Sequence, residues 1–246
     1  MADQSPARRL AGPAAAFCLG LAALALGGCA SPQPKWTGLI GPEPGLRAEG
    51  GEYPVWNDGR EKWRLPAAWK GDKNKAVVPQ GDWVYEDKAL AFHLEGAETL
   101  NAYRGRSHSL RVTLIQLAKP AKFNELRGTP TGLGRLLTDE ELGAVLSRET
   151  VTLYPGEGQA LTLDRAEQAR FLGIVAGYYD LDAGKVTRLI PIPPMHDRKS
   201  LFQKAVGAVR PYVPFTGPPP RPRPAHLKGW VKLGSTAIDG VEVRAH

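Results

Sequence analysis

The amino-acid sequence predicts a mainly β protein, a small β-sandwich with a short helical insertion and with extensions at both ends. Short apolar or alternating segments follow one another at close spacing between residues 86 and 192, which is typical of sandwich strands. Turn-forming residues separate these segments. One segment carries the start signal of a helix instead. We therefore expect residues 86–192 to form the sandwich.

The first two strands are predicted from the alternation of apolar residues. Period-two alternation marks a strand with one buried face, and it occurs over residues 88–94 and again over residues 110–117. The alternating apolar residues are Leu90, Phe92, Leu94, Leu110, Val112 and Leu114. The polar residues 96–109 between the two segments are expected to form a loop.

A short helix is predicted to begin at Thr138. Thr138 stands three residues before Glu141, the spacing at which a hydroxyl and a carboxylate cap a helix reciprocally. Leu142, Val145 and Leu146 follow at helical spacing, so one face can pack on a sheet.

Further strands are expected between residue 151 and residue 192. Their predicted ranges are 151–153, 159–163, 171–179 and 186–192, with turns at 154–157 and 180–184. A helix over residues 163–171 is an open alternative, because Ala166, Gln168 and Ala169 are good helix formers.

The N-terminal residues have the three-part layout of an export signal. Arg8 and Arg9 precede an apolar stretch over residues 10–26, and the stretch closes on Cys29. Glycine and proline weaken this stretch as a permanent membrane span. We therefore expect residues 1–28 to be removed, which takes away two arginines and one aspartate and leaves a net charge of +6.

Charge and chemistry argue against several function classes. Lys and Arg are scattered without an aromatic-interleaved basic stripe, so we predict no nucleic-acid partner. The five histidines are scattered, and no zinc-binding or serine-nucleophile motif occurs. We predict that the chain is not an enzyme, uses no cofactor or metal, and has no small-molecule substrate.

The cysteine context resembles the bacterial lipobox, with Leu26, Gly27 and Gly28 before Cys29. This resemblance implies lipidation of Cys29, whose acyl chains would anchor the mature protein firmly. Ala30 follows where an aspartate would imply retention in the inner membrane. The resemblance therefore implies an outer-membrane lipoprotein that faces the periplasm.

The ordered features behind this cysteine are similar to the TssJ family, the outer-membrane lipoproteins of the type VI secretion system. The similar segments are Leu100-Asn101, residues 111–117, Phe123, residues 138–146, residues 153–157 and residues 171–179. The resemblance implies a transthyretin-like β-sandwich with a small helical insertion. It also implies a place in the secretion membrane complex and a partner, the periplasmic C-terminal domain of the inner-membrane component TssM.

In this family the loop between the first two strands binds TssM. Carried onto this sequence, that loop is Asn101, Ala102, Tyr103, Arg104, Gly105, Arg106, Ser107 and His108. Tyrosine and arginine are enriched in binding hot spots, which suits a loop at the end of a sandwich. The family usually has a proline and an acidic residue after the asparagine, whereas Ala102 and Tyr103 stand here.

Two extensions flank the sandwich. Residues 29–85 form a tether and a Trp-rich extension, of which residues 53–69 are expected to pack on the sandwich because exposed tryptophans are unfavourable. Residues 193–246 form a Pro-rich extension, in which residues 195–209 fit a short helix. Asp239-Gly240 predicts a hairpin turn, and we expect that hairpin to join the sandwich edge or a partner.

The alternative function is a periplasmic lipoprotein that binds a ligand such as peptidoglycan in a cleft of the sandwich. Retention of the mature protein on peptidoglycan without binding to TssM would favour this alternative.

Overall fold

The computed structural model describes residues 53–65, 77–138, 142–195 and 222–246. Cys29, the export signal, and residues 196–209 of the predicted C-terminal helix lie outside the described residues.

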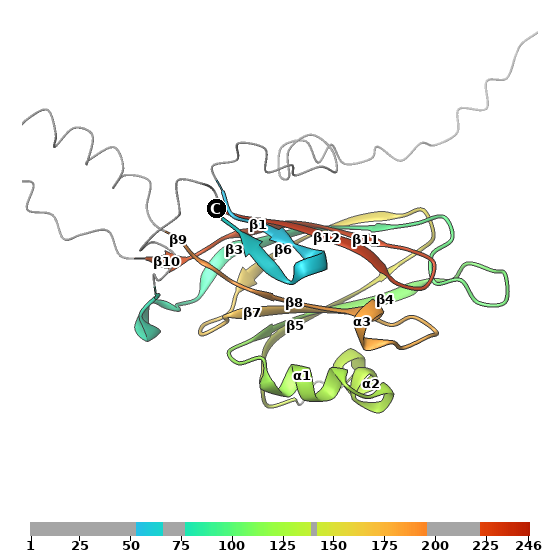
Figure 1. Cartoon of the computed structure of the whole chain (residues 1–246), viewed down its shortest axis with the longest axis horizontal. Helices are drawn as coiled ribbons and strands as arrows, with labels where there is room; N and C mark the ends of the chain where they lie inside the picture. Colours follow the sequence, from blue (N-terminus) through green and yellow to red (C-terminus); the bar gives the residue numbers. More distant parts are fainter. Residues whose placement is uncertain (1–52, 66–76, 139–141, 196–221) are drawn as a thin grey trace, which may run out of the picture. The chain divides into compact units, whose positions relative to one another are not determined.

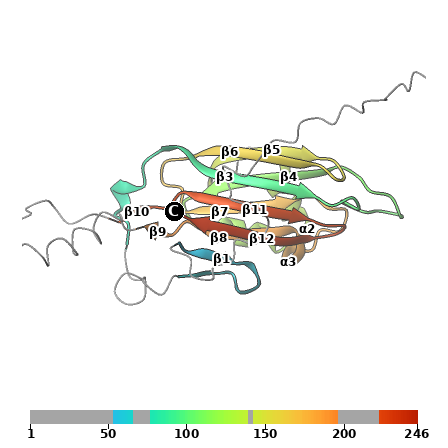
Figure 2. The same cartoon turned by 90° about the horizontal axis from the view of Figure 1, so that it is seen from above.

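Two β-sheets form the layers of the protein, and the predicted mainly β sandwich is confirmed (Figure 1). The first sheet has the strand order β2-β1-β12-β11-β3-β6, and the second has the order β5-β4-β7-β8. Figure 2 shows the first sheet from above. The strands are β1 Val55–Asn57, β2 Lys62–Arg64, β3 Glu86–Gly96, β4 Leu110–Leu117, β5 Val145–Leu153, β6 Gly158–Arg165, β7 Phe171–Ala176, β8 Thr187–Pro191, β11 Leu227–Leu233 and β12 Ile238–Ala245. A separate pair joins β9 Pro194–Met195 to β10 Arg223–Pro224.

The helical insertion lies earlier in the chain than predicted. Helix α1 spans Ala121–Arg127 and helix α2 spans Pro130–Thr138, so the prediction of a helix that begins at Thr138 is wrong. Pro130 suits the first turn of a helix, and the Thr129 hydroxyl accepts a hydrogen bond from the Gly132 amide (3.0 Å). Val145–Leu153 instead forms β5, because pairing with β4 satisfies its backbone.

The structure also decides one open alternative in favour of the predicted strand, and it differs from one predicted turn. Residues 159–165 continue as strand β6, so the alternative helix over 163–171 does not form. The expected turn at 180–184 includes the start of helix α3, Ala183–Val186, because the Asp182 side chain accepts a hydrogen bond from the Gly184 amide (3.0 Å). An Asp at this position is a favourable helix cap.

The core lies between the sheets and under the helical insertion. Leu90, Phe92 and Leu94 of β3 are at most 1% exposed. On the outer face of the second sheet, Phe123 of α1 packs against β7, where a side chain at Gly173 would collide with its ring. The helices therefore cover the second sheet, as Figure 1 shows.

The C-terminal hairpin is an inner part of the first sheet. Strand β11 lies between β12 and β3 and runs parallel to β3, from Leu227 opposite Leu90 to Leu233 opposite Gly96. The hairpin was expected at the sandwich edge or on a partner, and it is internal instead. Its turn lies at residues 234–237, whereas Asp239 and Gly240 belong to β12.

The Trp-rich extension packs on the sandwich over residues 53–65, as predicted. Trp56 is 4% exposed and meets Trp63 edge to face, with ring centroids 5.5 Å apart. The Trp63 indole donates a hydrogen bond to the Pro191 carbonyl (2.7 Å), which links β2 of the first sheet to β8 of the second. Trp69 lies outside the described residues.

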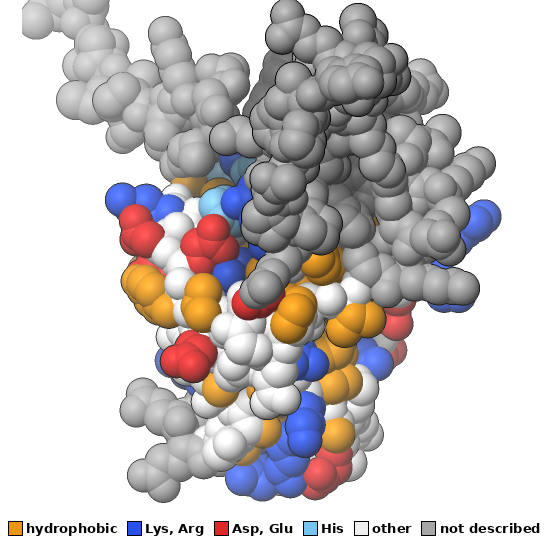
Figure 3. Space-filling model, turned by 90° about the vertical axis from the view of Figure 1, so that its left-hand side faces the viewer, with side chains coloured by type: hydrophobic (Ala, Val, Ile, Leu, Met, Phe, Trp, Pro, Cys, Tyr) orange, Lys and Arg blue, Asp and Glu red, His pale blue; other side chains and the backbone are white. Residues whose placement is uncertain are grey.

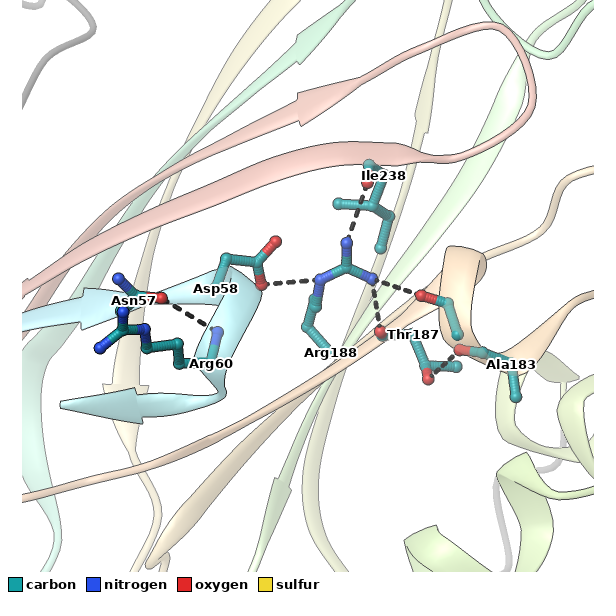
Figure 4. Close-up of polar contacts among 8 residues, drawn as sticks. Asn57, Asp58, Arg60, Ala183, Thr187, Arg188 and Ile238 are labelled. Carbon is teal, nitrogen blue, oxygen red and sulfur yellow. Dashed lines mark hydrogen bonds and ion pairs between the residues drawn. The ribbon is translucent and has the colours of Figure 1, made fainter.

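Arg188 holds the same side of the sandwich closed (Figure 4). Its Nε forms an ion pair with Asp58 (2.7 Å), and its two Nη groups donate to the carbonyls of Ile238 (3.0 Å), Gly184 (3.1 Å) and Thr187 (2.8 Å). One side chain of β8 therefore joins the N-terminal hairpin and β12.

Candidate partner-binding surface

Four loops meet at one end of the sandwich, at the right of Figure 1. Because β3 and β11 are parallel, the loops that follow them, residues 97–109 and 234–237, emerge at the same end. Antiparallel pairing brings residues 154–157 and 177–186 to that end as well. We call this set of loops the loop tip. The predicted partner-binding residues 101–108 lie in it.

The outermost part of the loop tip is a tight two-residue turn. Tyr103 and Arg106 form a β-bridge, with N–H···O distances of 2.9 and 3.1 Å. Arg104 and Gly105 between them have φ angles of 50° and 74°. Positive φ at both central residues matches the turn that joins twisted strands, and glycine adopts it without strain.

Asn101 fixes the base of this loop. It is 5% exposed, its Nδ2 donates to the Ser109 carbonyl (2.8 Å), and its Oδ1 accepts from the Tyr179 amide (3.1 Å). The Ala102 amide donates to the carbonyl of Ser235 (2.7 Å) in the C-terminal hairpin. Asn101 thus connects two loops and is not itself available to a partner.

Aromatic rings form the exposed surface beside the turn. Tyr103 stacks on Tyr179 with ring centroids 4.4 Å apart and planes 20° apart, and the guanidinium of Arg104 lies 5.2 Å from the Tyr103 ring. His108 meets Tyr179 edge to face at 5.2 Å. Tyr103 and Tyr179 remain 42% and 56% exposed. Stacking limits their freedom while leaving area for contact.

The structure therefore separates the predicted loop residues into two groups. Asn101 is buried, and Ala102 and His108 are half-buried. The exposed members are Tyr103, Arg104, Gly105, Arg106 and Ser107.

Sequence reasoning missed several residues of the loop tip. A hollow of about 210 Å³ lies beside Tyr103 and is also lined by Tyr179, Asp180, Ser235 and Thr236. Tyr179 was read as the end of an apolar strand, although β7 ends at Ala176. Ser235 and Thr236 carry no sequence signal, because strand pairing alone brings them to this end.

A buried tyrosine, Tyr178, also lines the hollow. Tyr178 is 3% exposed, and its hydroxyl donates to the Ala237 carbonyl (2.6 Å). Burial strongly raises the pKa of this hydroxyl, which keeps it a proton donor. The loop after β7 is therefore tied to the β11–β12 turn.

A polar cluster lies at the opposite end of the sandwich. Glu86 binds the guanidinium of Arg165 (2.7 Å) and Nε2 of His226 (2.5 Å), and the rings of His226 and His246 lie 5.6 Å apart. Arg165 is only 1% exposed. Figure 3 shows this end, where histidine, acidic and basic side chains adjoin hydrophobic ones.

Within the described residues, no group of three or more His, Cys, Asp or Glu side chains is placed to hold a metal ion. None of the helices in the described part of the chain is long and apolar enough to cross a membrane.

Comparison with solved structures finds several proteins of similar architecture. The T6SS lipoprotein TssJ1 from Pseudomonas aeruginosa is 23% identical, with a TM-score of 0.40 over 66% of this chain and 96% of that chain. Serratia marcescens Lip, a membrane-bound component of the type VI secretion system, is 18% identical, with a TM-score of 0.42 over 64% and 96%. A structure described as the T6SS protein TssM C-terminal domain from EAEC is 15% identical, with a TM-score of 0.39 over 61% and 94%.

Comparison with curated proteins finds no match. A family model does match, over residues 88–206, and its description is type VI secretion lipoprotein, VasD, EvfM, TssJ. The matched range includes β4–β8, both helices of the insertion and the predicted partner-binding loop. Residues 88–206 of the chain are therefore similar to the type VI secretion lipoprotein family.

Proposed function

We propose that this chain is a structural lipoprotein of the type VI secretion membrane complex, anchored in the outer membrane through acylated Cys29 and facing the periplasm. Its loop tip binds the periplasmic C-terminal domain of TssM and so links the complex to the outer membrane. The match of residues 88–206 to the secretion lipoprotein family supports this role.

One observation carries the proposal for the loop. Tyr103, Arg104 and Arg106 are exposed on a turn whose backbone is fixed by the Tyr103–Arg106 bridge and by Asn101. A rigid turn loses little conformational entropy on binding, so its exposed aromatic and cationic groups contribute more to affinity.

The loop is tested by replacing Tyr103, Arg104 and Arg106 together with alanine. All three side chains are exposed, and Gly105 keeps the turn, so the fold should persist. Isothermal titration against the TssM periplasmic domain should show affinity reduced about 100-fold or more, since hot-spot residues each contribute about 2 kcal/mol.

A control variant removes three exposed cations outside the loop tip, one more than the loop variant removes. Arg60, Lys62 and Arg64 lie in the N-terminal hairpin, which is not one of the four loops of the loop tip. Their replacement by alanine should leave the affinity within about twofold, because isolated surface charges contribute little. Unchanged affinity in the loop variant would remove residues 103–106 from the interface.

The anchor is tested by Cys29→Ser in cells. Without the thiol no acyl chain can be attached, and the apolar free energy of about 0.8 kcal/mol per buried methylene is lost. The variant should leave the outer-membrane fraction on fractionation. A variant that is processed and retained like the parent would contradict lipid anchoring.

A further inference from the structure

A second surface lies along one long side of the sandwich, between the edge strands β5 and β6. Each of these strands pairs on one side only, β5 with β4 and β6 with β3, within the described sheets. A groove of about 570 Å³ separates them and is lined by Leu146 and Glu149 of β5, by Leu163 and Asp164 of β6, and by Tyr85 and Glu167. It shares no lining residue with the hollow at the loop tip.

The other long side of the sandwich is closed. There Trp63 donates to the Pro191 carbonyl, and Arg188 binds Asp58, so the two edge strands β2 and β8 are tied together. Across the β5–β6 side the ties are few: buried Gln116 bonds to both the carbonyl of Asp164 (2.7 Å) and the amide of Ala166 (2.8 Å). The described residues thus cover one of the two open sides of the sandwich and leave the other accessible.

Apolar side chains are exposed along this groove. Leu146 is 42% exposed and Tyr85 is 58% exposed, whereas most large apolar side chains of the sandwich are buried. The Tyr85 hydroxyl bonds to Asp164, which holds the ring at the groove wall. Unpaired strand edges beside exposed apolar groups are a suitable surface for an extended peptide segment.

The negative charge of the groove favours a peptide segment that carries positive charge. Glu149, Asp164 and Glu167 line it, and none of the described lining residues is Lys or Arg. This local excess of negative charge contrasts with the net charge of +7 of the whole sequence. The amide of Lys88 donates to Asp164 (2.9 Å), and this bond lowers the pKa of the Asp164 carboxyl, so its charge persists at neutral pH.

We propose that the β5–β6 groove binds an extended, cationic segment of a partner protein. Basic side chains of the segment contact Glu149, Asp164 and Glu167, while alternating apolar side chains contact Leu146, Leu163 and Tyr85. The volume lies within the range of about 300–1,000 Å³ that holds a small ligand, so the groove accepts a short segment and not a folded domain. This surface is distinct from the loop tip, and its occupation does not depend on the TssM proposal.

The test uses a fluorescent peptide of alternating lysine and valine, and a second peptide of alternating glutamate and valine. Anisotropy titrations with the mature protein at about 0.15 M salt limit non-specific attraction, because the screening length is then about 8 Å. The lysine peptide should bind and the glutamate peptide should not. The variant Glu149→Lys/Glu167→Lys should weaken lysine-peptide binding about tenfold or more.

A charge-matched variant separates the groove from the general charge of the protein. Glu61 and Glu125 are exposed and lie outside the groove, so Glu61→Lys/Glu125→Lys changes the net charge equally. Its binding should stay within about twofold of the parent. The alanine variant at Tyr103, Arg104 and Arg106 should also bind the lysine peptide normally, which distinguishes this surface from the TssM site.

Three outcomes would overturn the proposal. One is the absence of lysine-peptide binding, and another is an equal loss in both charge-reversal variants. The third is a dimer in sedimentation velocity that Glu149→Lys/Glu167→Lys abolishes while the peptide fails to bind. That result would assign the groove to a second copy of this chain.

Discussion

At the scale of single residues, two arginines connect neighbouring elements of the sandwich, the buried Arg165 and the half-buried Arg188. Arg165 binds Glu86 and the Val84 carbonyl (3.3 Å). Burial alone would raise the pKa of Glu86, but the hydrogen bond from His226 and the charge of Arg165 lower it below its usual value. Arg188 has the corresponding role on the closed side of the sandwich. Arg188 donates through Nε and both Nη groups of one rigid guanidinium, which lysine lacks, whereas Arg165 makes both contacts, with Glu86 and with Val84, through Nη2.

Replacement of Arg188 by alanine should lower the free energy of unfolding by about 2–4 kcal/mol, since it leaves Asp58 and three carbonyls without a donor. Urea denaturation measures the change. Arg188→Lys should recover only part of it. Lys185→Ala, which breaks an exposed pair with Asp182, should change stability by less than about 0.5 kcal/mol. A loss below 1 kcal/mol for Arg188→Ala would contradict this role.

His246 of the polar cluster should make the stability of the fold depend on pH. Burial, followed by neighbouring positive charges, lowers the pKa of His246 to about 4. A histidine with a lowered pKa in the folded state stabilises the fold above the ordinary pKa of 6.5, and this stability is lost as the pH falls from 6.5 to 4. Burial also lowers the pKa of His93, so this residue adds to the same dependence. The lowered pKa of Glu86 affects the stability only at lower pH.

His246→Gln should therefore reduce the loss of stability between pH 6.5 and 4.5 by about 1–2 kcal/mol, allowing for partial exposure. Urea denaturation at several pH values measures both proteins. At pH 7.5 the two should differ little, because His246 is neutral there in either state. If the free energy of unfolding changed with pH in parallel for parent and variant, His246 would not be the source of the pH dependence.

At the scale of elements, the sequence predicted most of the strands of the sandwich but not the residues at which they begin and end. Alternation in β3 and β4 reports a buried face directly. The helix start at Thr138 was misplaced because a capping pattern measures only local preference, whereas pairing with β4 determines the conformation of Val145 to Leu153. The hairpin turn was misplaced in the same way, since the register of β11 and β12 puts Asp239 and Gly240 inside a strand.

Close strand packing gives a prediction at this scale. At Gly229 of β11, an added Cβ would lie 2.3 Å from the ring of Phe92 on β3. At Gly240 of β12, an added Cβ would meet no atom within 4 Å among the neighbouring described residues. Gly229→Ala should destabilise the protein by about 1–3 kcal/mol through overpacking. Gly240→Ala should be neutral or slightly stabilising, because alanine restricts the unfolded chain. Thermal unfolding would compare them, and equal shifts would contradict the packing argument.

At the scale of the whole molecule, the first sheet combines distant parts of the chain. Its neighbouring strands β1, β12, β11 and β3 come from both extensions and the predicted sandwich. Period and turn chemistry predict strands but not which strands pair, so the order of the sheet was beyond the sequence. For the same reason the loop 101–108 was predicted through family resemblance, whereas Tyr179, Ser235 and Thr236 beside it were not.

This order predicts that the C-terminal hairpin is required for folding. Removal of residues 222–246 would take away β11 and β12, leave β3 unpaired on one side, and remove the buried side chains of Val231, Leu233 and Val241 from the core. The shortened chain should show no cooperative thermal transition by circular dichroism. A cooperative transition near that of the parent would mean that residues 86–192 fold alone.

The central claim is that the rigid loop tip binds the TssM periplasmic domain. Hydrogen–deuterium exchange of the mature protein, alone and with that domain, tests it most directly because it reports every loop at once. We predict slowed exchange at residues 101–108, 177–180 and 234–237, with little change around His226 and in the β5–β6 groove. Protection at the opposite end or in the groove, with the loop tip unchanged, would contradict the account.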